Sequence, residues 1–81
     1  MNLLNSIKIN CESEDEAQNI YRLLAPEMQK SDRFSSKIER LKNIVVININ
    51  AKDAVALRSV INSYLRILSM TEKVDNITEE D

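Results

Sequence analysis

The spacing of apolar and polar residues predicts elements in the order strand, helix, strand, strand, helix. The first strand is predicted over residues 6–11, where Ile7, Ile9 and Cys11 alternate with polar residues. Such alternation places the apolar side chains on one face and the polar ones on the other. The chain therefore begins with a half-buried strand.

A helical period follows the first strand. Its apolar stripe, with the spacing i, i+3, i+4, i+7, consists of Ala17, Ile20, Tyr21 and Leu24. Ser13 and Glu16 have the spacing of a capping box at the helix start. Because Pro26 cannot donate to the helix ladder, we expect the helix to end near residue 24 or 25. The acidic cluster at residues 14–16 is therefore interpreted as a helix start rather than a metal site.

Two further strands are predicted over residues 34–41 and 44–51. The earlier strand is rich in charged and hydroxyl side chains, which favours an edge position because charge discourages pairing with another chain. The later strand, IVVININA, is the most apolar one and is expected to lie at the centre of the sheet. Lys42 and Asn43 would form the turn between them, with Asn43 tolerating a left-handed backbone.

The longest periodic segment, residues 51–71, predicts a second helix with a wide apolar arc. At about 100° per residue its apolar side chains cover roughly 180°, whereas a helix on a small sheet needs only about 100°. Asp53 is a suitable N-cap for this helix. Arg58 and Asn62, on the opposite polar side, either contact a partner or are simply solvated. The surplus edge of the arc is expected to be free for another surface and consists of Ala56, Val60 and Ile67.

These elements predict an α+β fold. We expect a three-stranded antiparallel sheet with the arrangement β-α-β-β-α, strand order 1-3-2 and both helices on one face, since crossovers are nearly always right-handed and the most apolar strand belongs at the centre. The single domain is expected to span residues 1–72. Residues 73–81 are acidic and lack a pattern, so they are predicted to form a disordered tail.

Composition and charge narrow the class of protein. Of the 81 residues, 43% are hydrophobic and 30% are charged, as in an ordinary soluble domain. The net charge of −2 does not indicate binding of nucleic acid or a membrane through overall charge. No apolar run approaches the roughly 20 residues of a membrane helix, and no secretory signal pattern is present. A cytoplasmic location without membrane contact is expected.

The residue inventory restricts catalytic chemistry. The chain has no histidine and one cysteine, Cys11, so a histidine metal site, a catalytic triad and an internal disulfide are excluded. We expect no catalytic residue, no metal and no cofactor. A small hydrolase is the enzyme alternative, but no nucleophile with a base or a phosphate cradle is recognisable. Cys11, Tyr21 and Tyr64 occupy core positions and are interpreted as packing residues.

One segment has a local excess of positive charge. Residues 22–42 include six basic side chains and three acidic ones. This segment is the candidate for contact with phosphate groups of a nucleic acid, although a charged edge strand that resists aggregation explains the same residues. The candidate residues for this contact are Arg22, Lys30, Arg33, Lys37, Arg40 and Lys42.

Two motifs resemble those of a known family. The first helix carries A-x-x-I-Y-x-x-L-x-P-E over residues 17–27, and the second carries A-x-D-x-x-x-L-R-x-x-x-N-S over residues 51–63. In this order and at this separation they resemble the Pcc family, the small dimerisation subunit of the KEOPS complex, with a likeness that covers about residues 6–69. Members of that family usually have glycine in the turn between the last two strands, whereas this chain contains no glycine.

The resemblance implies a non-catalytic role. KEOPS forms threonylcarbamoyladenosine beside the anticodon of tRNA, and its chemistry belongs to a separate ATP-binding catalytic subunit. In the Pcc family the small subunit joins two copies of the complex as a homodimer, packs its two helices against those of the catalytic subunit and can help hold tRNA. On this basis the predicted partner contacts are Leu23, Ala56, Val60, Ser63 and Ile67, and the six basic residues of segment 22–42 are the candidates for tRNA contact.

A free-standing RNA-binding module is the alternative function. A KH-type module shares the mixture of strands and helices, but its phosphate-clamping GXXG loop requires glycine, which this chain lacks. Strong, salt-sensitive RNA binding by the isolated chain would favour this alternative.

Overall fold

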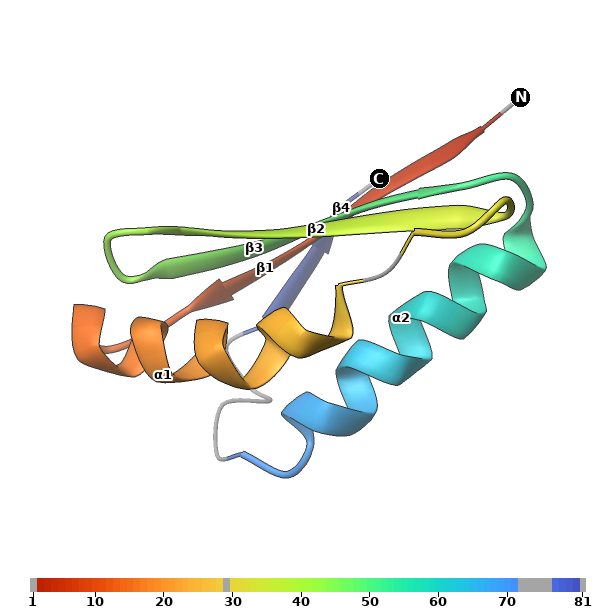
Figure 1. Cartoon of the computed structure of the whole chain (residues 1–81). Coiled ribbons are helices and arrows are strands. Elements are labelled where there is room, and N and C mark those ends of the chain that lie inside the picture. The colour runs from red at the N-terminus through yellow and green to blue at the C-terminus, as the bar shows by residue number, and fades with distance from the viewer. Residues whose placement is uncertain (1, 29, 72–76, 81) are drawn as a thin grey trace.

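The computed structural model describes residues 2–28, 30–71 and 77–80, and its strands and helices form two layers (Figure 1). Its elements in chain order are β1 (Leu3–Asn10), α1 (Glu14–Leu24), a 3-10 turn η1 (Ala25–Glu27), β2 (Phe34–Leu41), β3 (Ile44–Ala51), α2 (Ala54–Leu68) and β4 (Ile77–Glu80).

The sheet is antiparallel, with the order β2-β3-β1-β4. The predicted order of the first three strands, 1-3-2, is confirmed, and so is the α+β class with both helices beneath the same face (Figure 1). The short strand β4 is not predicted by the sequence. It differs from the expected disordered tail at residues 77–80, whereas residues 72–76 and 81 lie outside the described part of the chain.

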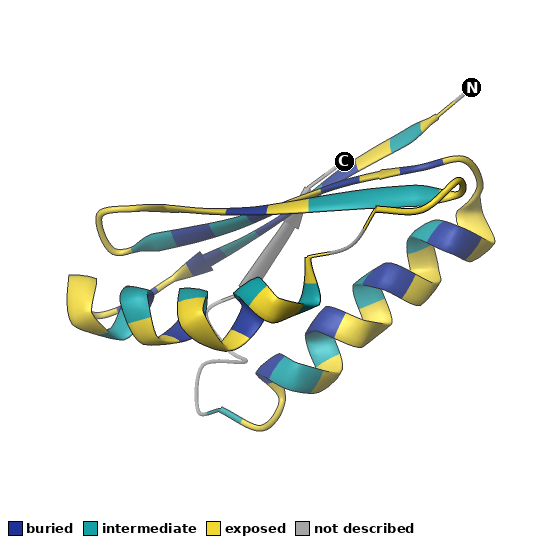
Figure 2. Cartoon of the chain, in the orientation of Figure 1, coloured by how far each residue is buried: buried dark blue, intermediate teal, exposed yellow. Residues whose placement is uncertain are grey.

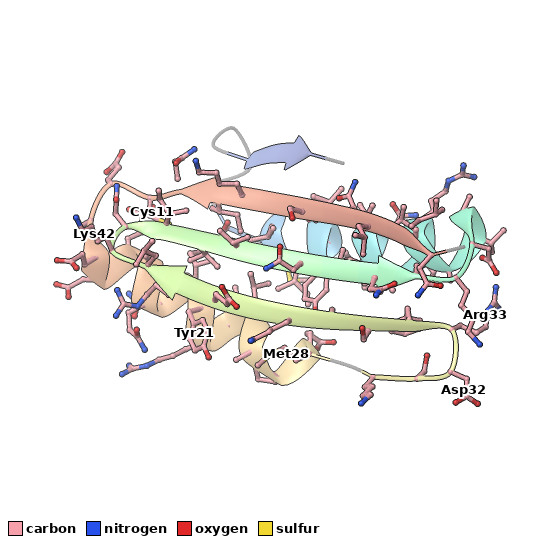
Figure 3. The ribbon with its side chains drawn as sticks, turned by 90° about the horizontal axis from the view of Figure 1, so that it is seen from above. Cys11, Tyr21, Met28, Asp32, Arg33 and Lys42 are labelled. Atoms are coloured by element: carbon pink, nitrogen blue, oxygen red, sulfur yellow. The ribbon has the colours of Figure 1, made fainter. Side chains whose placement is uncertain are left out.

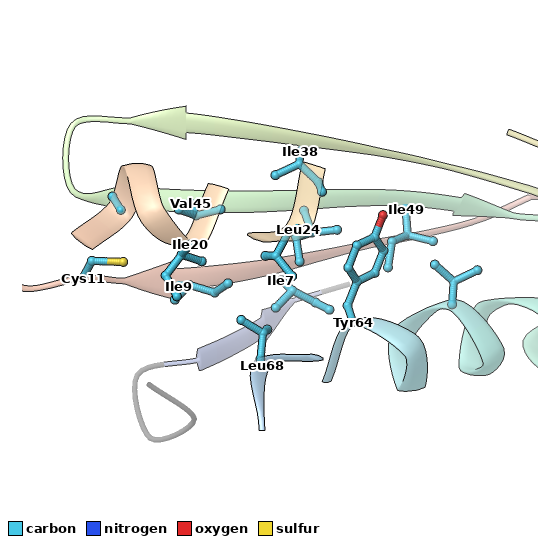
Figure 4. Packing of buried hydrophobic residues seen from close by; sticks show 13 residues of the cluster. Ile7, Ile9, Cys11, Ile20, Leu24, Ile38, Val45, Ile49, Tyr64 and Leu68 are labelled. Atoms are coloured by element: carbon cyan, nitrogen blue, oxygen red, sulfur yellow. The ribbon is translucent and has the colours of Figure 1, made fainter. Parts of the chain in front are cut away.

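The core lies between the sheet and the helices. Alternate residues of β1 and β3 point down to the helices because a strand places successive side chains on opposite faces. Figure 2 shows this alternation, and Figure 4 shows the side chains packed together. The residues of these two strands that are least exposed, at 2% or below, are Ile7, Ile9, Val45, Ile47, Ile49 and Ala51. Cys11 is also buried, as the sequence predicts.

The ends of α1 follow the local chemistry that the sequence predicts. The Ser13 hydroxyl accepts a hydrogen bond from the Glu16 backbone N–H at 3.1 Å, which satisfies one of the free donors at the helix start. At the other end, Pro26 lies in the first turn of η1, so the helix changes geometry directly after Leu24. These contacts fix the length of α1. Near the end of this helix, Leu23 is 45% exposed.

The turn between β2 and β3 has a different backbone conformation from the predicted one. Lys42, not Asn43, has the left-handed backbone, with φ at 56°. The Asn43 side-chain amide instead donates to the Cys11 carbonyl at 2.8 Å, and the Cys11 N–H donates to the Asn43 carbonyl at 2.8 Å. Asn43 therefore ties the turn to the connection between β1 and α1.

Candidate protein-interaction surface

The side chains of α2 fall into three rows that face different parts of the molecule. The inner row, which points at the sheet, consists of Ala56, Val60, Tyr64 and Leu68, and each of these is 5% exposed or less. The outer row, half-buried on one flank of the helix, consists of Leu57, Ile61 and Leu65. The groove row, on the other flank, consists of Ser59, Ser63 and Ile67, of which Ile67 is half-buried and the serines are exposed.

The inner row corrects the predicted orientation of the helix. The expectation that Ala56 and Val60 lie at a free edge of α2 is wrong, because both side chains are buried. The apolar arc is as wide as predicted, but the helix is rotated so that its buried part extends from the middle of the arc to the edge at Ala56 and Val60. The surplus apolar surface is therefore the outer row at the other end of the arc.

The groove row faces η1 and β2. A narrow cleft on this flank is lined by Val60, Ser63 and Tyr64 from α2 together with Glu27, Phe34 and Ser36. Since the groove row and the outer row lie on opposite flanks of the helix, the outer row faces the other way. In the sheet order, the side away from β2 is that of β1 and β4.

The Tyr64 hydroxyl joins three elements at the floor of this cleft. It donates to the Glu27 carbonyl at 3.0 Å and lies 2.6 Å from the Ser36 hydroxyl. Since a tyrosine hydroxyl has one hydrogen, the Ser36 hydroxyl is the donor in the second bond. Burial raises the pKa of Tyr64 above its usual value, the charge of Glu27 adds to this rise and the Ser36 hydrogen bond opposes it. The tyrosine thus fixes the position of α2 relative to η1 and β2.

Leu23 of α1 is 45% exposed, so its side chain is available at the surface. Of the predicted partner residues on α2, Ser63 lines the cleft and Ile67 lies half-buried on the same flank. Val60 lines the cleft from below as a buried residue, and Ala56 is buried too.

Asp53 fixes the start of α2. Its carboxylate accepts a hydrogen bond from the Ala56 N–H at 2.8 Å, which confirms the predicted N-cap. The same carboxylate pairs with the guanidinium of Arg33 at 3.1 Å. The Ala56 hydrogen bond and then the Arg33 contact hold the pKa of Asp53 below its usual value.

The predicted tRNA-contacting residues do not form one surface. Figure 3 shows Lys42 at one end of the sheet and Arg33 at the other, beside Asp53. Lys37 pairs with Glu39 at 3.3 Å on the open face of the sheet. Arg40 donates to the Lys42 carbonyl at 2.9 Å, so these two residues lie together at the turn. The remaining two, Arg22 and Lys30, are both exposed.

The sequence also predicts that the chain has no metal site and no membrane-spanning helix. In the described part of the chain, no three side chains of the metal-ligating types gather at one point. No described helix is long and apolar enough to cross a membrane. The outer row is the feature that sequence reasoning missed, although its i, i+4, i+8 spacing was the available signal.

The fold and the helix flanks define the class of protein as a small two-layer α+β module. A family model described as "Transcription factor Pcc1" matches residues 5–75, and the chain belongs to this family. This confirms the family predicted from the two helix motifs and supports a KEOPS-related subunit role.

One solved structure supports the fold independently. It is described as the crystal structure of a binary Gon7–Pcc1 complex, and the matching chain has a TM-score of 0.72 and 22% identity. The match covers 86% of this chain and 85% of that chain. At this identity the likeness shows the shared fold. No curated protein sequence matches the chain.

Proposed function

We propose that this chain is a non-catalytic scaffold and dimerisation subunit of a cytoplasmic KEOPS complex that modifies tRNA to threonylcarbamoyladenosine. The observation that carries the proposal is the surplus apolar surface of α2. The inner row is buried against the sheet, while Leu57, Ile61 and Leu65 contact the edge of the same core and remain only half-buried on the outer flank. A helix with apolar side chains beyond its own core is suited to packing against another chain.

The catalytic, ATP-binding subunit would dock at the space between α1 and α2. Its predicted contacts are Leu23, Ser63 and Ile67, and the small serine side chains of the groove row would allow a partner helix to approach closely. The buried residues beneath it, Ala56 and Val60, support these contacts through packing and need not touch the partner. Because Tyr64 fixes the cleft floor, the surface is formed before the partner arrives.

A second copy of the chain would bind on the other side, at the outer row and the edge of β1. The outer row faces this edge, so one partner could pair with the strand and cover Leu57, Ile61 and Leu65 together. The two docking surfaces lie on opposite flanks of α2. One chain could therefore bind the catalytic subunit and a second copy at the same time, as a dimerisation subunit has to.

Contact with tRNA is proposed as a contribution of the assembled complex. The turn residues Arg40 and Lys42 are the predicted basic residues that the structure brings together. Elsewhere Arg33 and Lys37 are paired with carboxylates. With basic groups divided between the ends of the sheet, a weak, salt-dependent contribution from this chain is expected.

The family description names a transcription factor, and the sequence left open a free-standing RNA-binding module. Both functions depend on binding nucleic acid by the chain itself. The net charge of −2 and the separated basic residues favour the scaffold. Salt-sensitive binding of tRNA or duplex DNA by the isolated chain at micromolar concentration would reverse this preference.

The test is the molar mass by light scattering after size exclusion, for the chain alone and mixed with the catalytic subunit. We expect a mass near twice 9.3 kDa for the chain alone and a larger species on mixing. Ile67→Glu and Leu23→Glu should prevent the larger species because they place a charge in the docking space. A chain that ignores the catalytic subunit would overturn the proposal.

Val55→Glu provides the matched control for this experiment. Val55 is 68% exposed at the start of the same helix and lies away from both flanks, so its substitution should leave docking unchanged. Val60→Glu is unsuitable, because Val60 is buried and a charge there would unfold the chain rather than report on docking.

A further inference from the structure

The outer edge of β1 is covered by the chain's own C-terminal strand. β4 pairs with β1 in antiparallel register, from Ser6 opposite Glu80 to Ile9 opposite Ile77. β4 has 4 residues whereas β1 has 8, so the cover extends along half of the strand. In the described part of the chain, Leu3–Asn5 has no strand beside it on this edge.

The opposite edge of the sheet is protected in another way. The Ile38 N–H of β2 donates to the thioether sulfur of Met28 at 3.4 Å, and the Ser31 N–H donates to the Phe34 carbonyl at 2.8 Å. β2 also carries the charges of Lys37, Glu39 and Arg40, which discourage pairing with a further strand. This edge is thus occupied by neighbouring residues and by charge.

Without β4, the edge of β1 would have little such protection. Its sequence, LLNSIKIN, has one charged residue and neither proline nor glycine, so each residue whose backbone groups point outward can donate and accept along the edge. An edge of this kind is a template for another strand. It also lies on the side that the outer row of α2 faces, where Leu57, Ile61 and Leu65 remain half-buried.

The sequence of β4 suits a strand that binds weakly. ITEE contains one apolar residue, and glutamate is disfavoured in strands. The strand also lies beyond residues 5–75, the part of the chain that the family model matches. It is therefore an addition to the family domain rather than part of its core sheet.

We propose that β4 is a displaceable cover of the β1 edge, and that a second copy of this chain displaces it to form the dimer. This inference rests on the proposed dimerisation at β1 and the outer row. A second copy would pair along the uncovered Leu3–Asn5 as well as the covered half, and it would bury the outer row, which is only half-buried in the single chain. The tail then sets the concentration at which the chain dimerises.

The size of the effect follows from mass action. Each copy has to release its own β4 before the two β1 edges can pair. The apparent dissociation constant of the dimer therefore depends on the square of the fraction of chains in which β4 is released. A cover that is docked about 75% of the time would weaken the dimer about 16-fold. Removing it should tighten the dimer by that factor.

The experiment compares the dissociation constant of the full chain with that of a chain ending at Thr71, by sedimentation equilibrium. We expect the shorter chain to dimerise at least about 10-fold more tightly. An equal or weaker dimer would overturn the cover while leaving the proposed dimer in place. If neither form dimerises, the proposed dimerisation fails and the cover fails with it.

Two proline variants of the full-length chain provide matched controls. Of two adjacent residues in an edge strand, one N–H points to the neighbouring strand and the other points outward. Of Thr78→Pro and Glu79→Pro, one should therefore reproduce the truncation and the other should behave like the unaltered chain. Equal dissociation constants for both variants and the unaltered chain would overturn the proposal.

A disulfide across the pair tests displacement directly. Lys8 and Thr78 are opposite each other in the register, so Lys8→Cys with Thr78→Cys would lock β4 onto β1. Cys11 is buried and should not compete for the new thiols. The oxidised chain should remain monomeric at concentrations where the reduced chain dimerises. Dimerisation of the locked chain with an unchanged dissociation constant would show that β4 need not leave.

Discussion

On the outer flank of α2, three large aliphatic side chains lie half-buried in a row, whereas the groove flank has two exposed serines and one isoleucine. Both flanks belong to one helix with one N-cap and one buried inner row. The outer flank suits a dry, apolar contact whose strength comes from buried area. The groove flank suits close approach of a partner backbone, with less apolar area and more dependence on a fixed shape.

The difference is reinforced by what lies beside each flank. The groove flank adjoins the cleft in which the Tyr64 hydroxyl joins η1 and β2. The outer flank consists of aliphatic side chains, and it faces the strand edge covered by β4. One flank is therefore shaped by hydrogen bonds within the domain, while the other depends on apolar area that a partner can bury.

The substitution with the largest expected effect disrupts the outer flank alone. Ile61→Glu should weaken self-association by at least about 100-fold, because a carboxylate in the middle of the outer row would have to be desolvated when the second copy binds. Binding of the catalytic subunit should stay within about 2-fold. Sedimentation velocity measures the first quantity and calorimetry the second.

Asn62→Glu is the control for this variant. It places the same charge one residue further along, on the exposed face between the flanks, and should change neither association. If Ile61→Glu abolishes both associations, or neither, then the two flanks do not serve different partners.

A second substitution removes the hydroxyl at the floor of the cleft beside the groove flank. Tyr64→Phe should lower the free energy of unfolding by about 1–3 kcal/mol, since it leaves the Glu27 carbonyl and the Ser36 hydroxyl without their buried partner. It should also weaken docking of the catalytic subunit more than self-association. Urea denaturation measures the first effect and calorimetry the second. A variant with unchanged stability would show that the hydroxyl does not hold the cleft.

Much of the fold could be predicted because its causes are local. Ser13 and Asp53 cap the two helices through side-chain bonds to residues three positions later, and such bonds follow from spacing alone. The alternation in β1 and β3 identified the buried face in the same way. The sheet order followed from connection rules and from β3 being the most apolar strand.

The rotation of α2 could not be predicted, because it has a non-local cause. The apolar arc is wider than the contact with the sheet, so the period fixes the arc but not the part of it that is buried. That choice depends on distant partners, such as the bonds from Tyr64 to Glu27 and Ser36. The predicted partner residues therefore include Ala56 and Val60, which are buried in the structure, and leave out the half-buried outer row.

β4 and the turn at Lys42 escaped prediction for related reasons. ITEE has no alternating pattern of its own, and it forms a strand by pairing with an edge that lies far away in the sequence. Similarly, Asn43 was assigned a backbone role from its type, whereas the structure uses its side chain to reach Cys11. In each case the partner was not a sequence neighbour.

A high-pH titration sharpens the account of the groove flank. Burial raises the pKa of Tyr64 above 10.0, so the folded state favours the neutral phenol. The resulting stabilisation is fully present below about pH 10 and is lost as the pH rises through the folded pKa. The urea midpoint of the unaltered chain should therefore fall more steeply above pH 10 than that of Tyr64→Phe. Parallel curves for the two chains would contradict the raised pKa.

The smallest expected effect concerns the helix start that both flanks share. The pKa of Asp53 is lowered from 3.8, first by the Ala56 hydrogen bond and then by Arg33, so its contribution to stability is present above about pH 4 and is lost as the pH falls through the folded value. Asp53→Asn keeps a capping oxygen but removes the charge, so the thermal midpoint of this variant should fall less steeply between pH 5 and 3. Scanning calorimetry measures both midpoints. At neutral pH both associations should weaken equally and only slightly, because a frayed first turn moves Leu57 and Ser59 together. A selective loss of one association would mean that this turn belongs to one flank.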